Sequence, residues 1–136
     1  MKRATKIICL CLFVSPLLGC SYVKVEPISQ NDVQSITVTE LFVDKESLLC
    51  DDAQIRHFIK AFNSARLFRN DWETTDPLCA DVLFTDGTHL LVWGGSTEGY
   101  LAMVKTDAQG VRGEQQNIQS LRLDIWFAKM LRILQD

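Results

Sequence analysis

The side chains that could act as nucleophiles or bases are few in this chain of 136 residues, and they lie far apart. Its two histidines are His57, expected on the polar side of a helix, and His89, expected on a strand opposite Phe84. Neither has a spacing such as HxxxH that would hold a metal ion. Ser96 lies in the glycine-rich segment 94–99, which lacks the second glycine and the following helix of a GxSxG nucleophile elbow. The sequence therefore predicts that the protein is not an enzyme.

The first nineteen residues have the parts of a secretory signal. Residues 1–6 include three cations and no acid, and residues 7–18 are mostly apolar. A basic start followed by a short apolar stretch is typical of a signal peptide. The alternative is a retained membrane anchor, but spanning a bilayer takes about 20 apolar residues, and Pro16 interrupts this shorter stretch. We therefore expect residues 1–19 to be removed.

Leu17-Leu18-Gly19-Cys20 ends this segment and resembles the lipobox of bacterial lipoproteins. The resemblance covers residues 1–20 only. It implies cleavage before Cys20, lipid on the Cys20 sulfur and acylation of the new amino terminus, so that the protein is held on a membrane. Enterobacterial lipoproteins retained in the inner membrane carry an aspartate after this cysteine. Ser21 stands there instead, which implies the outer membrane, facing the periplasm.

Cleavage leaves 117 residues with eleven cations and seventeen acids, a net charge of −6. This length fits one domain with its own core. An acidic, exported chain is not expected to bind nucleic acid. Residues 20–34 are polar and aperiodic, so we expect a lipidated N-terminus and a flexible tether with a reach of roughly 20 Å. Residues 35–136 would form the globular domain.

Two cysteines, Cys50 and Cys79, remain after cleavage and lipidation. An even pair in an oxidising compartment predicts a disulfide. Two cysteines this far apart, without a CxxC partner, lack the spacing of a zinc site, although a catalytic thiol stays possible in principle. No cofactor is expected.

The predicted disulfide would draw several carboxylates together. Asp51 and Asp52 would approach Asp76 and Asp81, and oxygen ligands of this kind suit Ca²⁺. Local roles explain three of the four acids: Asp51 caps a helix, Asp52 favours the positive end of its dipole, and Asp76 begins a turn before a proline. The sequence leaves cation binding open as the less favoured interpretation, and we assign no metal ligand.

The order of elements predicts an α+β fold with the sequence β-α-β-β-β-α. Asp51 and Gln54 have the spacing of a capping box at the start of the first helix. Asp86-Gly87 predicts a hairpin with a type I′ turn. The expected strands are 36–43, 80–85, 88–93 and 100–105, and the expected helices are 52–66 and 118–134. We expect one antiparallel sheet of about four strands with two helices packed on it. This part of the chain resembles no family that we recognise.

The last predicted helix is apolar on more than one side. One stripe is broad and would face the core; it consists of Leu123, Trp126, Phe127, Met130 and Leu134. On the other side Leu121, Ile125 and Ala128 alternate with charged residues, Asp124 among them. Core packing is the commoner explanation for such residues, and a docking face for a partner is the alternative. Trp72, in a long acidic loop, is a second candidate contact.

These patterns favour a lipid-anchored envelope protein, not an enzyme, that binds another envelope protein as an accessory subunit, assembly factor or inhibitor. The candidate partner-binding residues are Leu121, Ile125 and Trp72. The alternative is a periplasmic module that binds a small ligand or a metal ion.

Overall fold

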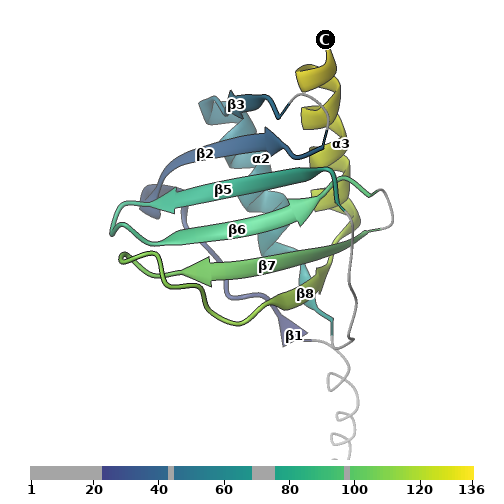
Figure 1. The fold of residues 1–136 in the computed structure, drawn as a ribbon. Coiled ribbons are helices and arrows are strands. Elements are labelled where there is room, and N and C mark those ends of the chain that lie inside the picture. The colour runs from purple at the N-terminus through teal and green to yellow at the C-terminus, as the bar shows by residue number, and fades with distance from the viewer. Residues whose placement is uncertain (1–22, 43–44, 69–75, 97–98) are drawn as a thin grey trace, which may run out of the picture.

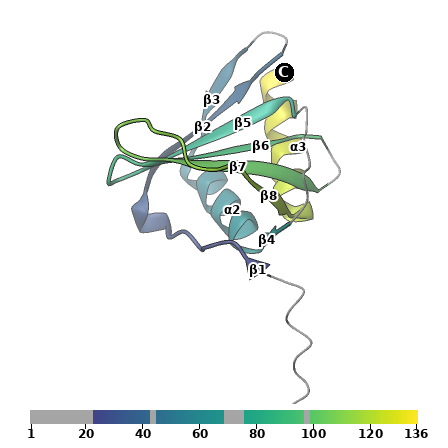
Figure 2. The same ribbon diagram turned by 60° about the horizontal axis from the view of Figure 1, so that its bottom comes forward.

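The computed structural model describes residues 23–42, 45–68, 76–96 and 99–136. A single antiparallel sheet forms one layer, and two α-helices cover one of its faces (Figures 1 and 2). The predicted α+β class is therefore confirmed. The predicted strand number was wrong, because the sheet has eight strands instead of about four.

The strands follow the order β1-β4-β8-β7-β6-β5-β2-β3 across the sheet. Their bounds are β1 Val23–Lys24, β2 Val33–Glu40, β3 Ser47–Leu49, β4 Arg66–Leu67, β5 Leu78–Phe84, β6 His89–Gly94, β7 Tyr100–Thr106 and β8 Gln116–Gln119. The four strands that the sequence did not predict (β1, β3, β4 and β8) have two to four residues each. Strands this short have too few residues to show an alternating pattern, so pairing with a neighbouring strand defines them and not a local sequence signal.

The hairpin of β5 and β6 is confirmed, with Leu83 opposite His89. Its turn is not the predicted type I′, which needs a positive φ at both central residues. Gly87 has a φ of +90°, whereas Asp86 is not among the residues with positive φ. The Gly87 N–H donates to the Phe84 carbonyl at 3.0 Å. This is a type I turn followed by a left-handed glycine, the usual three-residue hairpin loop.

The first helix is α2 (Asp52–Asn63), and both hydrogen bonds of the predicted capping box are present. The Asp51 N–H donates to the Gln54 side chain, and the Gln54 N–H donates to the Asp51 side chain, each at 2.8 Å. The second helix is α3 (Leu121–Gln135), capped by Ser120. In the part of the chain that the structure describes, neither helix is long and apolar enough to cross a membrane.

The core lies between the sheet and the inner faces of α2 and α3. The aromatic side chains of Phe58, Phe62, Trp126 and Phe127 occupy its centre. Gly94, the last residue of β6, lets α3 approach the sheet closely. A Cβ at this position would lie 2.3 Å from Phe127 Cδ2, well inside van der Waals contact.

Residues 25–32, here called the N-terminal strap, pack on the domain and do not form the predicted free tether. Val25 is buried, and its N–H donates to the Ala65 carbonyl at 3.2 Å. The Asn63 side-chain amide both accepts from the Ile28 N–H and donates to the Ile28 carbonyl, each at 2.9 Å. The strap ends in a 3₁₀ turn (η3, Gln30–Asp32) that leads directly into β2. The sequence missed this because these contacts join residues about 35 positions apart.

We predict that Gly94→Ala destabilises the fold by about 2 kcal/mol or more, because the new methyl group would overlap the Phe127 ring. Urea unfolding of the purified protein measures the change. Gly110→Ala is the matched control: Gly110 has a φ of +86° but nothing within 4 Å of its Cβ position, so it should lose only about 1 kcal/mol. Equal stabilities of Gly94→Ala and the parent protein would contradict the close packing of α3.

Candidate functional site

The outward side of α3 carries two of the residues that the sequence assigned to a partner. Leu121 and Ile125 are 68% and 58% exposed, although both side chains are large and apolar. The broad stripe on the other side of the helix is buried, with Phe127 fully enclosed. α3 therefore buries one apolar face and presents another.

A groove of about 410 Å³ runs between α2 and α3, here called the interhelical groove. Its floor includes the buried side chains of Ala61, Trp126 and Met130. Ile125 and Ile133, 58% and 43% exposed, line it on the α3 side. Their spacing of eight residues places them on one stripe of the helix.

Trp126 joins the two helices beneath this groove. Its indole N–H donates to the Gln54 carbonyl in α2 at 3.0 Å. Its ring meets Phe58 of α2 edge-on at a centroid distance of 4.9 Å, and it meets Phe127 in the same way at 5.2 Å. These directional contacts fix how α2 and α3 pack against each other beneath the groove.

The charged residues that line the interhelical groove are all basic. Lys60 stands on α2, and Arg122 and Lys129 stand on α3; Gln54 and His57 of α2 are the other polar residues of the lining. Among the residues that the structure describes, no aspartate or glutamate lines the groove. This is a local excess of positive charge on a chain whose net charge is negative.

The N-terminus of α3 is fastened by Gly99, which precedes β7. The Gly99 N–H donates to a carboxylate oxygen of Asp124 at 3.0 Å, and the Gly99 carbonyl accepts from the Ser120 N–H at 2.8 Å. Asp124 is buried, so the prediction that it lies on the outer charged side of the helix was wrong. A Cβ on Gly99 would lie 2.9 Å from Leu121, which shows that Leu121 sits over this junction and outside the groove.

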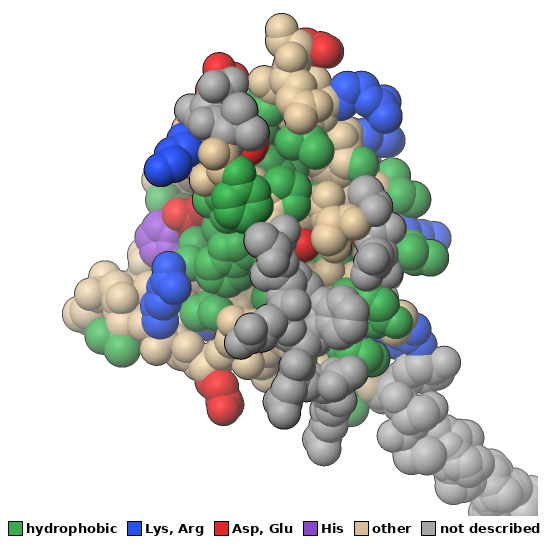
Figure 3. All heavy atoms as spheres, turned by 45° about the vertical axis from the view of Figure 1, so that its right-hand side comes forward, with side chains coloured by type: hydrophobic (Ala, Val, Ile, Leu, Met, Phe, Trp, Pro, Cys, Tyr) green, Lys and Arg blue, Asp and Glu red, His purple; other side chains and the backbone are tan. Residues whose placement is uncertain are grey.

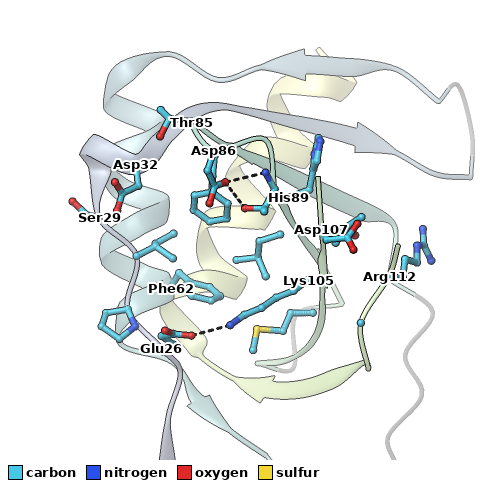
Figure 4. Close-up of a pocket in the computed structure, with 18 of the residues that line it drawn as sticks. Glu26, Ser29, Asp32, Phe62, Thr85, Asp86, His89, Lys105, Asp107 and Arg112 are labelled. Carbon is cyan, nitrogen blue, oxygen red and sulfur yellow. Dashed lines mark hydrogen bonds and ion pairs between the residues drawn. The ribbon is translucent and has the colours of Figure 1, made fainter. Parts of the chain in front are cut away.

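A second cavity, of about 840 Å³, lies beside the N-terminal strap (Figure 4). Its inner lining includes Phe62, Leu90 and Met103, from α2, β6 and β7, all of which belong to the core. Lys105 and Glu26 form an ion pair of 2.9 Å at its edge. Lys105 lowers the pKa of the Glu26 carboxyl through this hydrogen bond and its charge, but the pair is exposed and contributes little to stability. The sequence did not predict the cavity, since the strap was expected to be a tether.

Hydrophobic side chains also gather on the sheet face that the helices leave open (Figure 3). Leu91 and Trp93 of β6 alternate with core residues and are half-buried there. The Arg112 guanidinium lies over the Trp93 ring at 5.9 Å from its centroid.

The predicted disulfide between Cys50 and Cys79 is absent, and both thiols are free. Cys50 belongs to the core on the helix side, whereas Cys79 alternates with the core residues Leu78 and Ala80 and so points to the other face of the sheet. Strand β2 also separates them, because Cys79 lies opposite Thr39 and the Cys50 N–H donates to the Ile36 carbonyl. Sequence separation and compartment alone do not reveal the face on which a cysteine lies.

The acidic cluster depended on that disulfide and does not form. Within the described residues no three His, Cys, Asp or Glu side chains come close enough to hold a metal ion. Asp51 caps α2, as expected, and Asp81 pairs with His89. The arrangement therefore lends no support to a calcium site at this end of the fold.

The nearest approach to a catalytic arrangement is the pair His89 and Asp81. His89 Nδ1 and Asp81 Oδ1 are 2.7 Å apart on the open face of the sheet. His89 lies opposite Leu83 and not opposite Phe84 as predicted. Cys79 is on the same face, but burial and the negative charge of Asp81 raise the pKa of its thiol to about 11. A thiol with so high a pKa is a poor nucleophile near neutral pH.

Two residues that the sequence singled out, Cys20 and Trp72, lie outside the described residues. Comparison of the chain with models of protein families, with characterised proteins and with solved structures found no match. The site must therefore be interpreted from its own geometry.

We predict that both cysteines alkylate as free thiols in the denatured, unreduced protein, and slowly in the folded one. Burial raises the pKa of each thiol from 9.0 to about 11, so at pH 8 the folded protein holds roughly a hundredfold less thiolate than an exposed cysteine would. Labelling should accelerate as the pH rises toward 11, since the thiols then ionise. Peptide mass spectrometry measures alkylation at each cysteine, and a linked Cys50–Cys79 peptide would overturn the structural assignment.

Proposed function

We propose that this chain is a lipid-anchored protein of the bacterial cell envelope, not an enzyme, that binds another envelope protein through the interhelical groove. The observation that carries the proposal is the pair of exposed isoleucines, Ile125 and Ile133, on a groove between two helices that pack together through Trp126. Apolar side chains exposed together beside a recess are a common mark of a protein interface.

The anchor part of the proposal rests on the lipobox-like residues Leu17-Leu18-Gly19-Cys20. If Cys20 carries lipid, only residues 20–22 lie between the lipid and β1. Three residues span about 10 Å at most, so the β1 edge of the sheet would lie next to the membrane. The residue after Cys20 is a serine, which supports placement in the outer membrane, facing the periplasm.

A binding role, as opposed to catalysis, is supported by the placement of the reactive side chains. Cys50 is enclosed in the core, and burial together with the negative charge of Asp81 raises the pKa of the Cys79 thiol to about 11. The groove itself is lined by apolar and basic side chains, which suit recognition better than proton transfer. An accessory, assembly or inhibitory role needs only such a surface and an anchor.

We predict that a photo-crosslinking amino acid at Ile125, in the full-length protein made in its own bacterium, forms an adduct with one defined envelope protein. The same residue at Leu49 is the matched control, since Leu49 is 67% exposed and lies on β3, away from the groove. The expected pattern is an adduct at Ile125 and Ile133 and none at Leu49. Mass spectrometry of the same preparation should give an acylated N-terminal peptide that begins at Cys20.

Two results would contradict the proposal. Equal adducts at Ile125 and Leu49 would mean that contact is not specific to the groove. An uncleaved chain with a free Cys20 thiol would remove the envelope anchor. Circular dichroism should remain unchanged in each variant, because all the substituted side chains are at the surface.

A second candidate function, binding of a small apolar ligand, is favoured by the cavity beside the N-terminal strap. Its volume of about 840 Å³ falls within the range of ligand sites, and its inner wall is apolar. We predict that a dansyl-labelled fatty acid binds saturably if this is the function, and that Ile28→Ser weakens binding at least fivefold while Leu49→Ser does not. The absence of saturable binding, or equal effects of the two substitutions, would remove this candidate.

A further inference from the structure

We propose that the partner segment that binds the interhelical groove is an amphipathic α-helix with acidic flanks. This inference rests on the proposed function and adds to it the chemistry of the partner. It follows from the shape of the groove, the sign of the charges around it and the position of the groove relative to the point where the chain enters the fold.

The groove has the dimensions of a short helical segment. Its lining on α3 runs from Arg122 to Ile133, which at 1.5 Å per residue is roughly 16 Å. A partner helix of about three turns has the same length and presents apolar side chains at i, i+3, i+4 and i+7 along one face. Such a face would contact Ile125 and Ile133 and lie over Trp126 and Met130. An extended strand would instead bind at a sheet edge, where unpaired backbone groups can form hydrogen bonds with it.

The charges select an acidic helix. Lys60 stands on one side of the groove and Arg122 and Lys129 on the other, so a bound helix would have cations along both flanks. Arg122 and Lys129 are seven residues apart on α3, or about 10 Å, the same spacing as acids at i and i+7 on a partner. A helix with lysines at those positions would meet like charges, which is costly at an interface.

The same charges argue against a second copy of this chain as the occupant. A two-fold dimer through this face would place the same patch on both sides of the interface. Lys60, Arg122 and Lys129 would then face the equivalent cations of the other copy. Nothing acidic in the groove lining would offset that repulsion.

An anionic lipid surface shares the required chemistry, but the geometry favours a protein. The chain enters the described fold at β1, on one side of the domain, and α3 ends on the opposite side (Figures 1 and 2). The groove follows α3 across the helix layer, from the β8 end toward β2. A membrane held close to β1 by Cys20 would therefore meet one end of the groove and not its length. Trp126 and Met130 are also recessed, whereas a bilayer is reached by protruding side chains.

The test uses the full-length lipoprotein in nanodiscs of neutral phosphatidylcholine and two labelled helical peptides. The peptides have the same leucine face and differ only in their flanks, which carry glutamates in one peptide and lysines in the other. Fluorescence anisotropy gives the two dissociation constants. The acidic peptide should bind at least tenfold more tightly, and its affinity should fall as salt is added.

Charge reversal in the groove sharpens the test. Lys129→Glu should weaken the acidic peptide about tenfold and strengthen the basic one, and Ile125→Ser should weaken both. Lys24→Glu is the matched control, because it makes the same charge change at an exposed position on β1, outside the groove. That variant should bind both peptides as the parent protein does.

Four outcomes would overturn the inference. They are equal binding of the two peptides, equal effects of Lys129→Glu and Lys24→Glu, binding of phosphatidylglycerol vesicles that is lost in Ile125→Ser, and a concentration-dependent dimer that is lost in Ile125→Ser.

The failure of this inference is separable from the failure of the proposed function. If cross-linking at Ile125 in the cell maps to a segment that is not acidic, the inference falls and protein binding stands; if neither peptide binds and no adduct forms, both fall.

Discussion

The contact on which the rest of the structure depends is the aromatic junction around Trp126. One indole ring packs edge-on against Phe58 of α2 and Phe127 of its own helix, and its N–H bonds to the Gln54 carbonyl. A buried indole needs a partner for its N–H, and here the partner is backbone in the neighbouring helix. This single bond links the orientation of α2 to that of α3. The interhelical groove lies directly above the junction, and the junction sets the width of the groove.

The approach of α3 to the sheet depends equally on the absence of a side chain at Gly94. Phe127 occupies the space that a Cβ would need, so the helix layer sits close over β6. Close packing on the inner side turns the opposite side of α3 toward solvent. Leu121, Ile125 and Ile133 are exposed for this reason, since a helix on one face of a single sheet has only one side to bury. The exposed apolar stripe is thus a consequence of the layer architecture and of a helix that is apolar on more than one side.

The cavity beside the N-terminal strap and the interhelical groove differ in a way that bears on their use. The cavity beside the N-terminal strap has a lining of mixed charge, and residues of the domain core form its inner wall. The described residues that line the interhelical groove have charges of one sign and include exposed apolar side chains. Charges of one sign around an apolar recess favour a partner of opposite charge and exclude others, which is the basis of specificity at many interfaces. This contrast is why we place the protein partner at the helices and only a small ligand at the strap.

By itself the sequence determined the elements whose signals are local. The capping box of Asp51 and Gln54, the hairpin at Asp86-Gly87 and the two-sided apolar pattern of α3 all depend on residues close together in the chain, and all three form. The hairpin turn is not the predicted type I′, and α3 begins at Leu121 and not at residue 118, because residues 118 and 119 belong to β8. The same periodicity left two explanations for Leu121 and Ile125, core packing and a docking face, and the structure has both side chains exposed. Only the tertiary structure decided the features that depend on distant pairing. The two-residue strands β1 and β4 form only because they pair with neighbouring strands, and the strap is fastened by Asn63, 35 residues beyond Ile28.

Cys50 and Cys79 lie on opposite faces of the sheet because the strand register, which has a period of two, sets the face for each residue. The basic side chains that line the groove could not be predicted as a group from the sequence either. Lys60 and Lys129 line one groove only because α2 and α3, which most of the strands separate along the sequence, pack together.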